Sequence, residues 1–117
     1  MLGYVATAAA WGFLKSQALG LTRSPRPFHS FGVPELLEEV EFRAGLEHGL
    51  GRTILGLRPA VARLGAAALF GLCHPGNELD AALGGFLYSK AYEAHGLVGS
   101  TLTHLTHNLF VHLGGKP

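Results

Sequence analysis

The sequence has few charged residues and a single cysteine. Charged side chains make up 15% of its 117 residues, against about 25% in an average soluble protein. The nine lysines and arginines are scattered, so the sequence lacks the basic patch of a nucleic-acid-binding protein, and we expect no nucleic-acid partner. The lone cysteine, Cys73, excludes an intrachain disulfide framework and a cysteine metal cluster, and we predict that its side chain is buried.

The motifs of several enzyme classes are also absent from the sequence. It contains no HExxH zinc helix and no phosphate-binding Walker loop. No serine stands in the glycine-flanked context of a nucleophile elbow. Alternating apolar and polar residues bounded by hairpin turns, the pattern of a β-strand, do not occur convincingly. These absences direct attention to helices and to polar residues placed on them.

Long hydrophobic runs are missing as well. No stretch of about 18 residues or more is free of charged and strongly polar side chains, so hydropathy alone gives little support for membrane spans. The best candidates are Met1 to Leu21, which Lys15 interrupts, and Ala94 to Gly115, which carries four histidines. Functional polar residues lower such scores in an intramembrane enzyme. The first stretch lacks a basic start and a cleavage site, so we predict a retained helix rather than a signal peptide.

Apolar segments rich in alanine, leucine and glycine alternate with turn signals. Prolines predict a loop over residues 22–33, Gly49 and Gly51 end the next segment, residues 74–77 form a turn, and Gly96 breaks a later helix. The predicted helices cover about 2–21, 34–50, 60–74, 79–94 and 98–113. We therefore predict one all-α domain over residues 1–117, a multi-pass transmembrane bundle of about four or five helices.

A first polar cluster, Glu38-Glu39-Val40-Glu41-Phe42-Arg43, lies on the second predicted helix. Glu39 and Arg43 are four residues apart, so they can pair on one face of an α-helix. Glu38 points about 100° away from that face and is free for another partner. A solvated acidic helix start, favoured by the helix dipole, explains the same residues without any function.

Two further clusters carry histidines. Phe70-Gly71-Leu72-Cys73-His74 ends the third predicted helix, where a histidine also interacts favourably with the helix dipole without catalysing. His104 and Asn108 are four residues apart on the last helix, where they also suit a polar seam between packed helices. An unpaired ionisable group is costly in an apolar segment, so three such clusters together indicate a shared polar site inside a bundle.

The order and spacing of the clusters resemble the EExxxR, FxxxH and HxxxN signatures of the CAAX protease and bacteriocin-processing family, which includes the type II CAAX prenyl endopeptidases. The resemblance covers about residues 32–113, including Gly84-Gly85, and departs from the family at Glu41 and Ala44. It implies an intramembrane endopeptidase that acts on a prenylated, bacteriocin-like or C-terminal sorting-tail substrate. The implied partners are a peptide or protein tail and the lipid bilayer, in a multi-pass protein of the bacterial inner membrane.

The resemblance also implies a glutamate-activated water as the nucleophile. Glu38 would be the general base, because a carboxylate removed from bulk water is a better base near neutral pH. His74 would orient the water, and Arg43 would hold Glu39.

His104 and Asn108 would donate hydrogen bonds to the developing oxyanion. This mechanism needs no cofactor. Glu38, His74 and His104 could instead form a zinc-ligand set with an open position, as in a zinc-dependent membrane protease. We favour the metal-free mechanism, because an asparagine such as Asn108 suits an oxyanion donor and is a poor zinc ligand.

Two other classes of function compete with the peptidase. A peptidase requires Glu38, His74, His104 and Asn108 to converge. A non-catalytic membrane or immunity-type protein of the same fold allows that convergence without turnover. A small soluble helical domain with structural histidines predicts that these polar groups are dispersed.

Overall fold

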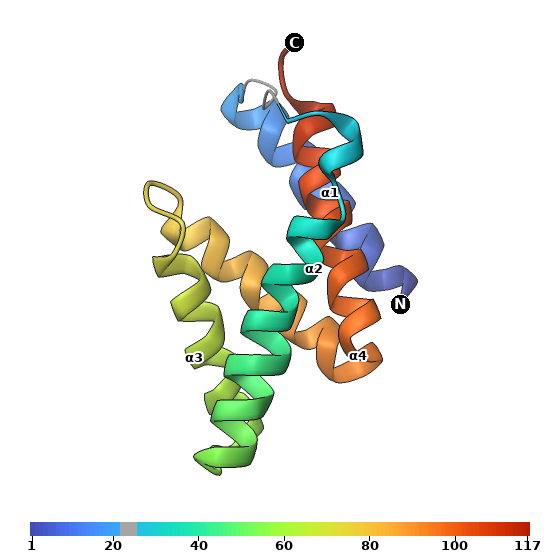
Figure 1. Ribbon diagram of the computed structural model, residues 1–117. Helices are drawn as coiled ribbons and strands as arrows, with labels where there is room; N and C mark the ends of the chain where they lie inside the picture. The colour runs from blue at the N-terminus through green and yellow to red at the C-terminus, as the bar shows by residue number, and fades with distance from the viewer. Residues whose placement is uncertain (22–25) are drawn as a thin grey trace.

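The computed structural model describes residues 1–21 and 26–117, and its regular elements are all helical (Figure 1). In chain order they are α1 (Leu2–Leu19), the 3-10 turn η1 (Phe28–Ser30), α2 (Val33–Glu39), the π-helix η2 (Val40–Ile54), α3 (Pro59–Leu72) and α4 (Glu78–Gly114). The prediction of an all-α protein is therefore confirmed. Of the predicted loop, residues 22–25 lie outside the described residues.

Gly96 divides α4 into two helices, as its sequence context predicts. Its φ of 71° and ψ of −161° are not helical, and a residue with a Cβ rarely adopts a positive φ. The half of α4 before Gly96 packs along α3, and the half after it runs beside α1 (Figure 1). The break thus allows one continuous segment to contact both α3 and α1.

The second predicted helix is longer than the sequence indicates. α2 and η2 follow each other without interruption down the middle of the molecule (Figure 1). The prediction that Gly49 and Gly51 end this helix is wrong, because both lie inside η2 and Gly51 is buried. Packing overrides the low helix propensity of glycine here. The helical segment ends at Ile54, before Gly56 with its φ of 64°.

α3 ends at Leu72, directly before the turn that the sequence predicts at residues 74–77. The prediction that Cys73 is buried is wrong: its side chain is exposed. The physical reason is that Cys73 follows the last helical residue, where the chain leaves the packed face of α3.

The interior of the protein is unusually polar, and much of its exterior is apolar. Large charged side chains are seldom fully buried in a protein unless they are paired. Large apolar side chains are exposed on every α-helix, Leu2 of α1 and Leu79 of α4 among them. The largest fully buried side chains include Arg43, Tyr88, Glu35, Glu39 and Thr103. Folding therefore gathers the polar groups rather than dispersing them.

Among the described residues, no helix has both the length and the apolar character expected of a membrane span. The transmembrane part of the fold prediction is thus not confirmed.

Candidate active site

Glu39 and Arg43 form a fully buried ion pair at the junction of α2 and η2. The Arg43 Nε lies 3.1 Å from the Glu39 Oε1, and neither side chain is exposed. The predicted pairing of these two residues is present in the structure. The Nη1 and Nη2 atoms of Arg43 find no hydrogen-bond partner among the described residues, and its guanidinium carbon lies 5.3 Å from the centre of the Phe70 ring. The buried charge therefore depends mainly on Glu39.

Gly85 provides the space that the Arg43 guanidinium occupies. A Cβ at Gly85 would lie 3.3 Å from each of three atoms: Arg43 Nη2, the Cα of Ala67 and the Cβ of Phe70. Separations this short require the neighbours to move by a few tenths of an ångström, so the tight packing here favours glycine. A Cβ at Gly84 would lie 3.2 Å from the Tyr88 hydroxyl oxygen, so both glycines of the Gly84-Gly85 pair leave room for side chains of the site.

The His104 ring lies between two carboxylates. Its Nδ1 is 2.8 Å from the Glu39 Oε2, and its Nε2 is 3.5 Å from the Glu38 Oε2. The first contact is a good hydrogen bond, whereas the second is at the outer limit for one. Glu39 is buried, but 40% of the Glu38 side chain is exposed. One carboxylate can therefore fix the ring while the other is accessible to small molecules.

Aromatic residues hold the plane of the His104 ring. Tyr88 stacks on it with ring centres 4.4 Å apart and an angle of 14° between the planes. Phe70 meets it edge-on at 5.6 Å. These contacts and the bond to Glu39 leave the ring little freedom to rotate, which is the rigid support that a catalytic side chain needs.

His74 joins this cluster through Phe70. Its Nδ1 lies 2.6 Å from the Phe70 carbonyl oxygen, and the two rings are 4.5 Å apart. A carbonyl oxygen only accepts, so Nδ1 carries the hydrogen, and Nε2 of the neutral ring remains an acceptor. Because that carbonyl belongs to the last turn of α3, His74 also acts as a helix-end residue. Within the described contacts, no hydrogen bond or ion pair connects His74 with Glu38 or His104.

Asn108 is held by a second glutamate. Its Nδ2 lies 2.7 Å from the Glu35 Oε2, and its Oδ1 lies 3.1 Å from the His107 Nδ1. Burial raises the pKa of Glu35, but hydrogen bonds from Arg26, Asn108 and the Gly32 amide outweigh it and lower the pKa to about 2. Glu35 is therefore an ionised acceptor, and the Asn108 amide must present its nitrogen to it.

The two pairs Glu39–His104 and Glu35–Asn108 repeat one helical turn apart. Glu35 precedes Glu39 by four residues on α2, and Asn108 follows His104 by four on α4, so the two helices run antiparallel at this point. The structure thus brings the first and third predicted clusters into direct contact, with His74 at one side.

Several residues of this region are missing from the sequence prediction. The spacing offers a signal for Glu35, which stands one turn before Glu39, and for His107, which is three residues after His104. No periodicity or motif indicates the others. The residues not predicted are Lys15, Glu35, Asp80, Tyr88 and His107.

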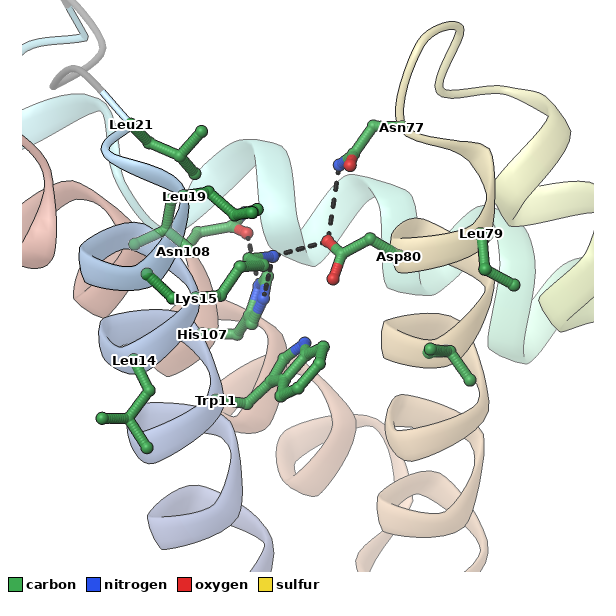
Figure 2. A pocket seen from close by; sticks show the side chains of 13 residues that line it. Trp11, Leu14, Lys15, Leu19, Leu21, Asn77, Leu79, Asp80, His107 and Asn108 are labelled. Carbon is green, nitrogen blue, oxygen red and sulfur yellow. Dashed lines mark hydrogen bonds and ion pairs between the residues drawn. The ribbon is translucent and has the colours of Figure 1, made fainter.

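A cavity of about 660 Å³ opens beside Asn108, between α1 and α4 (Figure 2). Apolar side chains such as Trp11 and Leu79 form most of its walls. Five polar side chains line it: Lys15, Asn77, Asp80, His107 and Asn108. Neither Glu38 nor His104 lines this cavity, so Asn108 is the predicted site residue that connects it with the carboxylate–histidine cluster.

The alternative zinc set requires three ligands around one point. Within residues 1–21 and 26–117, no three His, Cys, Asp or Glu side chains are arranged to hold a metal ion. Glu38 and His104 approach each other, but no described polar contact joins His74 to either of them. The arrangement of Glu38, His74 and His104 thus does not fit a zinc centre.

Comparison with protein families gives a match over most of the chain. A family described as Type II CAAX prenyl endopeptidase Rce1-like matches residues 27–110, which is most of the chain and includes all six predicted site residues. No curated protein and no solved structure matches the chain.

Proposed function

The chain belongs to the Type II CAAX prenyl endopeptidase Rce1-like family, and we propose that it is a peptidase in which Glu38 activates water to attack a peptide bond. One observation carries this proposal: the His104 ring lies between the buried Glu39 and the accessible Glu38. A fixed histidine beside a reachable carboxylate is the arrangement that general-base hydrolysis needs.

In the proposed reaction, Glu38 removes a proton from water as the water oxygen attacks the carbonyl carbon. The carbonyl oxygen then bears the negative charge. When this intermediate collapses, the carbon–nitrogen bond breaks and Glu38 returns the proton to the leaving amine. Glu39, held by Arg43, keeps the His104 ring in place by accepting from Nδ1, and the acceptor Nε2 of His74 orients the water.

The oxyanion would be stabilised by Asn108 and by the Nε2–H of a doubly protonated His104 ring, because Nδ1 of that ring already donates to Glu39. A primary amide nitrogen carries two hydrogens, and Asn108 donates one of them to Glu35. The second remains for the oxyanion. Donors that are fixed before the reaction are effective because they need no reorganisation as charge develops, and each contributes about 10²–10³ in rate.

The cavity beside Asn108 would bind the apolar part of the substrate. Its apolar walls suit a hydrophobic side chain or lipid group of a peptide or protein tail. A prenylated, a bacteriocin-like and a C-terminal sorting tail all fit this description, and we propose a substrate of this class.

We further propose that the apolar exterior contacts a lipid bilayer. Large apolar side chains are exposed on every α-helix, while the charged side chains of Glu35, Glu39, Arg43 and Glu47 are buried. Continuous exposed apolar surface marks a lipid or protein contact. A multi-pass location in the bacterial inner membrane stays a prediction from the resemblance. Partition of the expressed chain into the membrane fraction, retained after carbonate washing, is the expected result; recovery in the wash would contradict it.

Cleavage of peptide tails by matched glutamine variants tests the proposed mechanism. A prenylated tail peptide and the same peptide without lipid are incubated with wild type, Glu38→Gln and Glu41→Gln. Glu41 is exposed and belongs to the same motif, so it controls for loss of one charge. We expect Glu38→Gln to lose about 10²–10⁴ in rate and Glu41→Gln to keep wild-type activity.

Equal activity of Glu38→Gln and wild type would refute the glutamate mechanism. Failure of wild type to cleave any tail would favour the non-catalytic protein of the same fold. We also propose that no metal takes part, so activity should persist in excess chelator. Stoichiometric zinc in the purified protein, with activity lost on its removal, would overturn that part of the proposal.

A further inference from the structure

A line of hydrogen bonds links α1 with Asn108 through residues to which the family resemblance assigns no role. The Lys15 ammonium lies 2.5 Å from the Asp80 Oδ2 and 2.9 Å from the His107 Nε2. The Nδ1 of His107 lies 3.1 Å from the Asn108 Oδ1. Figure 2 shows these side chains meeting inside the cavity, from α1 and from both halves of α4.

The chemistry of each group fixes the direction of every bond in this line. An ammonium only donates, so the Nε2 of His107 must accept and the ring hydrogen must be on Nδ1. Nδ1 then donates to the Asn108 Oδ1. The Asn108 nitrogen is left facing Glu35, a carboxylate that only accepts. Lys15 and Glu35 therefore demand the same orientation of the amide from opposite sides.

We infer that Lys15 is a positioning residue, which through His107 keeps the Asn108 amide with its N–H groups toward the reacting carbonyl. The inference rests on the proposed function, because it concerns an oxyanion donor. An inverted amide would place its oxygen, and thus negative partial charge, where the oxyanion develops. The two orientations of the Asn108 amide have nearly the same shape. Holding the amide in the orientation that presents N–H therefore matters as much for the rate as having an amide at this position.

Burial makes this line of contacts more than a surface ion pair. The Lys15 side chain is 10% exposed and that of Asp80 is 19% exposed. Exposed ion pairs contribute little, whereas a desolvated ammonium needs its partners. Burial, and next the charge of Lys15, lower the pKa of His107 from 6.5 to about 4. The imidazole is thus neutral at physiological pH, as the acceptor role of Nε2 requires.

Few polar or charged groups face the His107 ring. They are Lys15 on α1, Asp80 and Tyr88 on the first half of α4, and His104 and Asn108 on its own helix. Of these described groups, Lys15 is the cation in direct contact with the ring, and it makes Nε2 the accepting nitrogen.

The first experiment reads the His107 tautomer by nitrogen-15 NMR of histidine-labelled full-length protein, which needs no turnover. The Nδ1–H tautomer is expected in wild type. In Lys15→Met, which keeps the apolar stem and loses the ammonium, His107 is expected to titrate at higher pH and to show a smaller population of that tautomer. Lys15→Arg keeps a cationic hydrogen-bond donor, so this variant should keep the Nδ1–H tautomer of His107. An Nε2–H tautomer in wild type would overturn the inference even if Lys15→Met does not fold.

The second experiment measures kcat and KM for Lys15→Met, Asn108→Ala and the double variant. Lys15→Met should lower kcat about 10-fold or more, up to the 10²–10³ of a lost donor, with little change in KM. In the Asn108→Ala background it should have no further effect, because the amide that it positions is gone. An equal loss in both backgrounds would show a merely structural role and overturn the inference. The NMR result separates this failure from failure of the proposed hydrolysis.

Discussion

His104 donates from Nδ1 to the Glu39 carboxylate at 2.8 Å, across 65 positions of sequence. This bond joins the first polar cluster of the chain to the third and leaves Nε2 of the ring directed at Glu38, 3.5 Å away. Because Glu39 is also paired with Arg43, the buried ion pair and the proposed catalytic histidine form one unit. Substitution of Glu39 should therefore lower mainly the stability of the fold, and substitution of its neighbour Glu38 should lower mainly the activity.

Glu39→Gln should destabilise the fold strongly. It leaves the buried Arg43 without its ion-pair partner, and breaking such a pair typically costs about 3–5 kcal/mol. Denaturant unfolding of the purified protein measures the change. Glu38→Gln is the matched control: its side chain is 40% exposed, so its free energy of unfolding should change far less. Equal losses for both variants would show that the Glu39–Arg43 pair is not the main support.

Asn108→Ala should lower kcat by about 10²–10³ and leave residual turnover, since one oxyanion donor is lost while water activation remains. Steady-state cleavage of the same peptide tail gives the value. Thr106→Ala on the same helix is the control, because its hydroxyl donates to the Leu102 carbonyl of that helix and, among the described residues, to no residue of the site. A variant at position 108 with wild-type kcat would remove Asn108 from the mechanism.

Gly85→Ala and Gly65→Ala should change stability in opposite directions. A Cβ at Gly85 would crowd Arg43, Ala67 and Phe70 at 3.3 Å, and such overpacking costs about 1–3 kcal/mol. A Cβ at Gly65 meets nothing within 4 Å, so alanine there should stabilise α3 by about 0.5–1 kcal/mol. Unfolding free energies of the two variants decide the sign. Stabilisation by Gly85→Ala would contradict the packing described around Arg43.

Stability should fall as the pH drops from about 6.5 to about 4, in part through His107. Its pKa is lowered from 6.5 to about 4 in the fold, so the unfolded chain takes up the proton first and gains in relative stability over that window. Below pH 4 the His107 ring is protonated in the folded protein as well. The stability that the neutral ring contributes is then fully lost and changes no further with pH. Melting temperatures of wild type and His107→Gln between pH 4 and 7 test this. The variant should show a shallower decline, and parallel curves would contradict the assignment.

Much of the fold could be read from the sequence because its signals are local. Turn residues at 74–77 and the glycine at position 96 act on the backbone where they stand, and the structure has its breaks there. Glu39 and Arg43 pair because residues four apart share a helix face. The order of three short motifs was enough to indicate the family, which the family match confirms.

The sequence by itself thus determined an all-helical chain, its main breaks, the Glu39–Arg43 pair and the family. Only the tertiary structure decided that His104 meets both Glu38 and Glu39, that Glu35 holds Asn108, and that Lys15 reaches His107. Tertiary packing also extends η2 through Gly49 and Gly51, although glycine has a low helix propensity. The physical reason is that a contact between helices depends on how their faces pack, and spacing along one helix holds no information about the partner that burial brings to it.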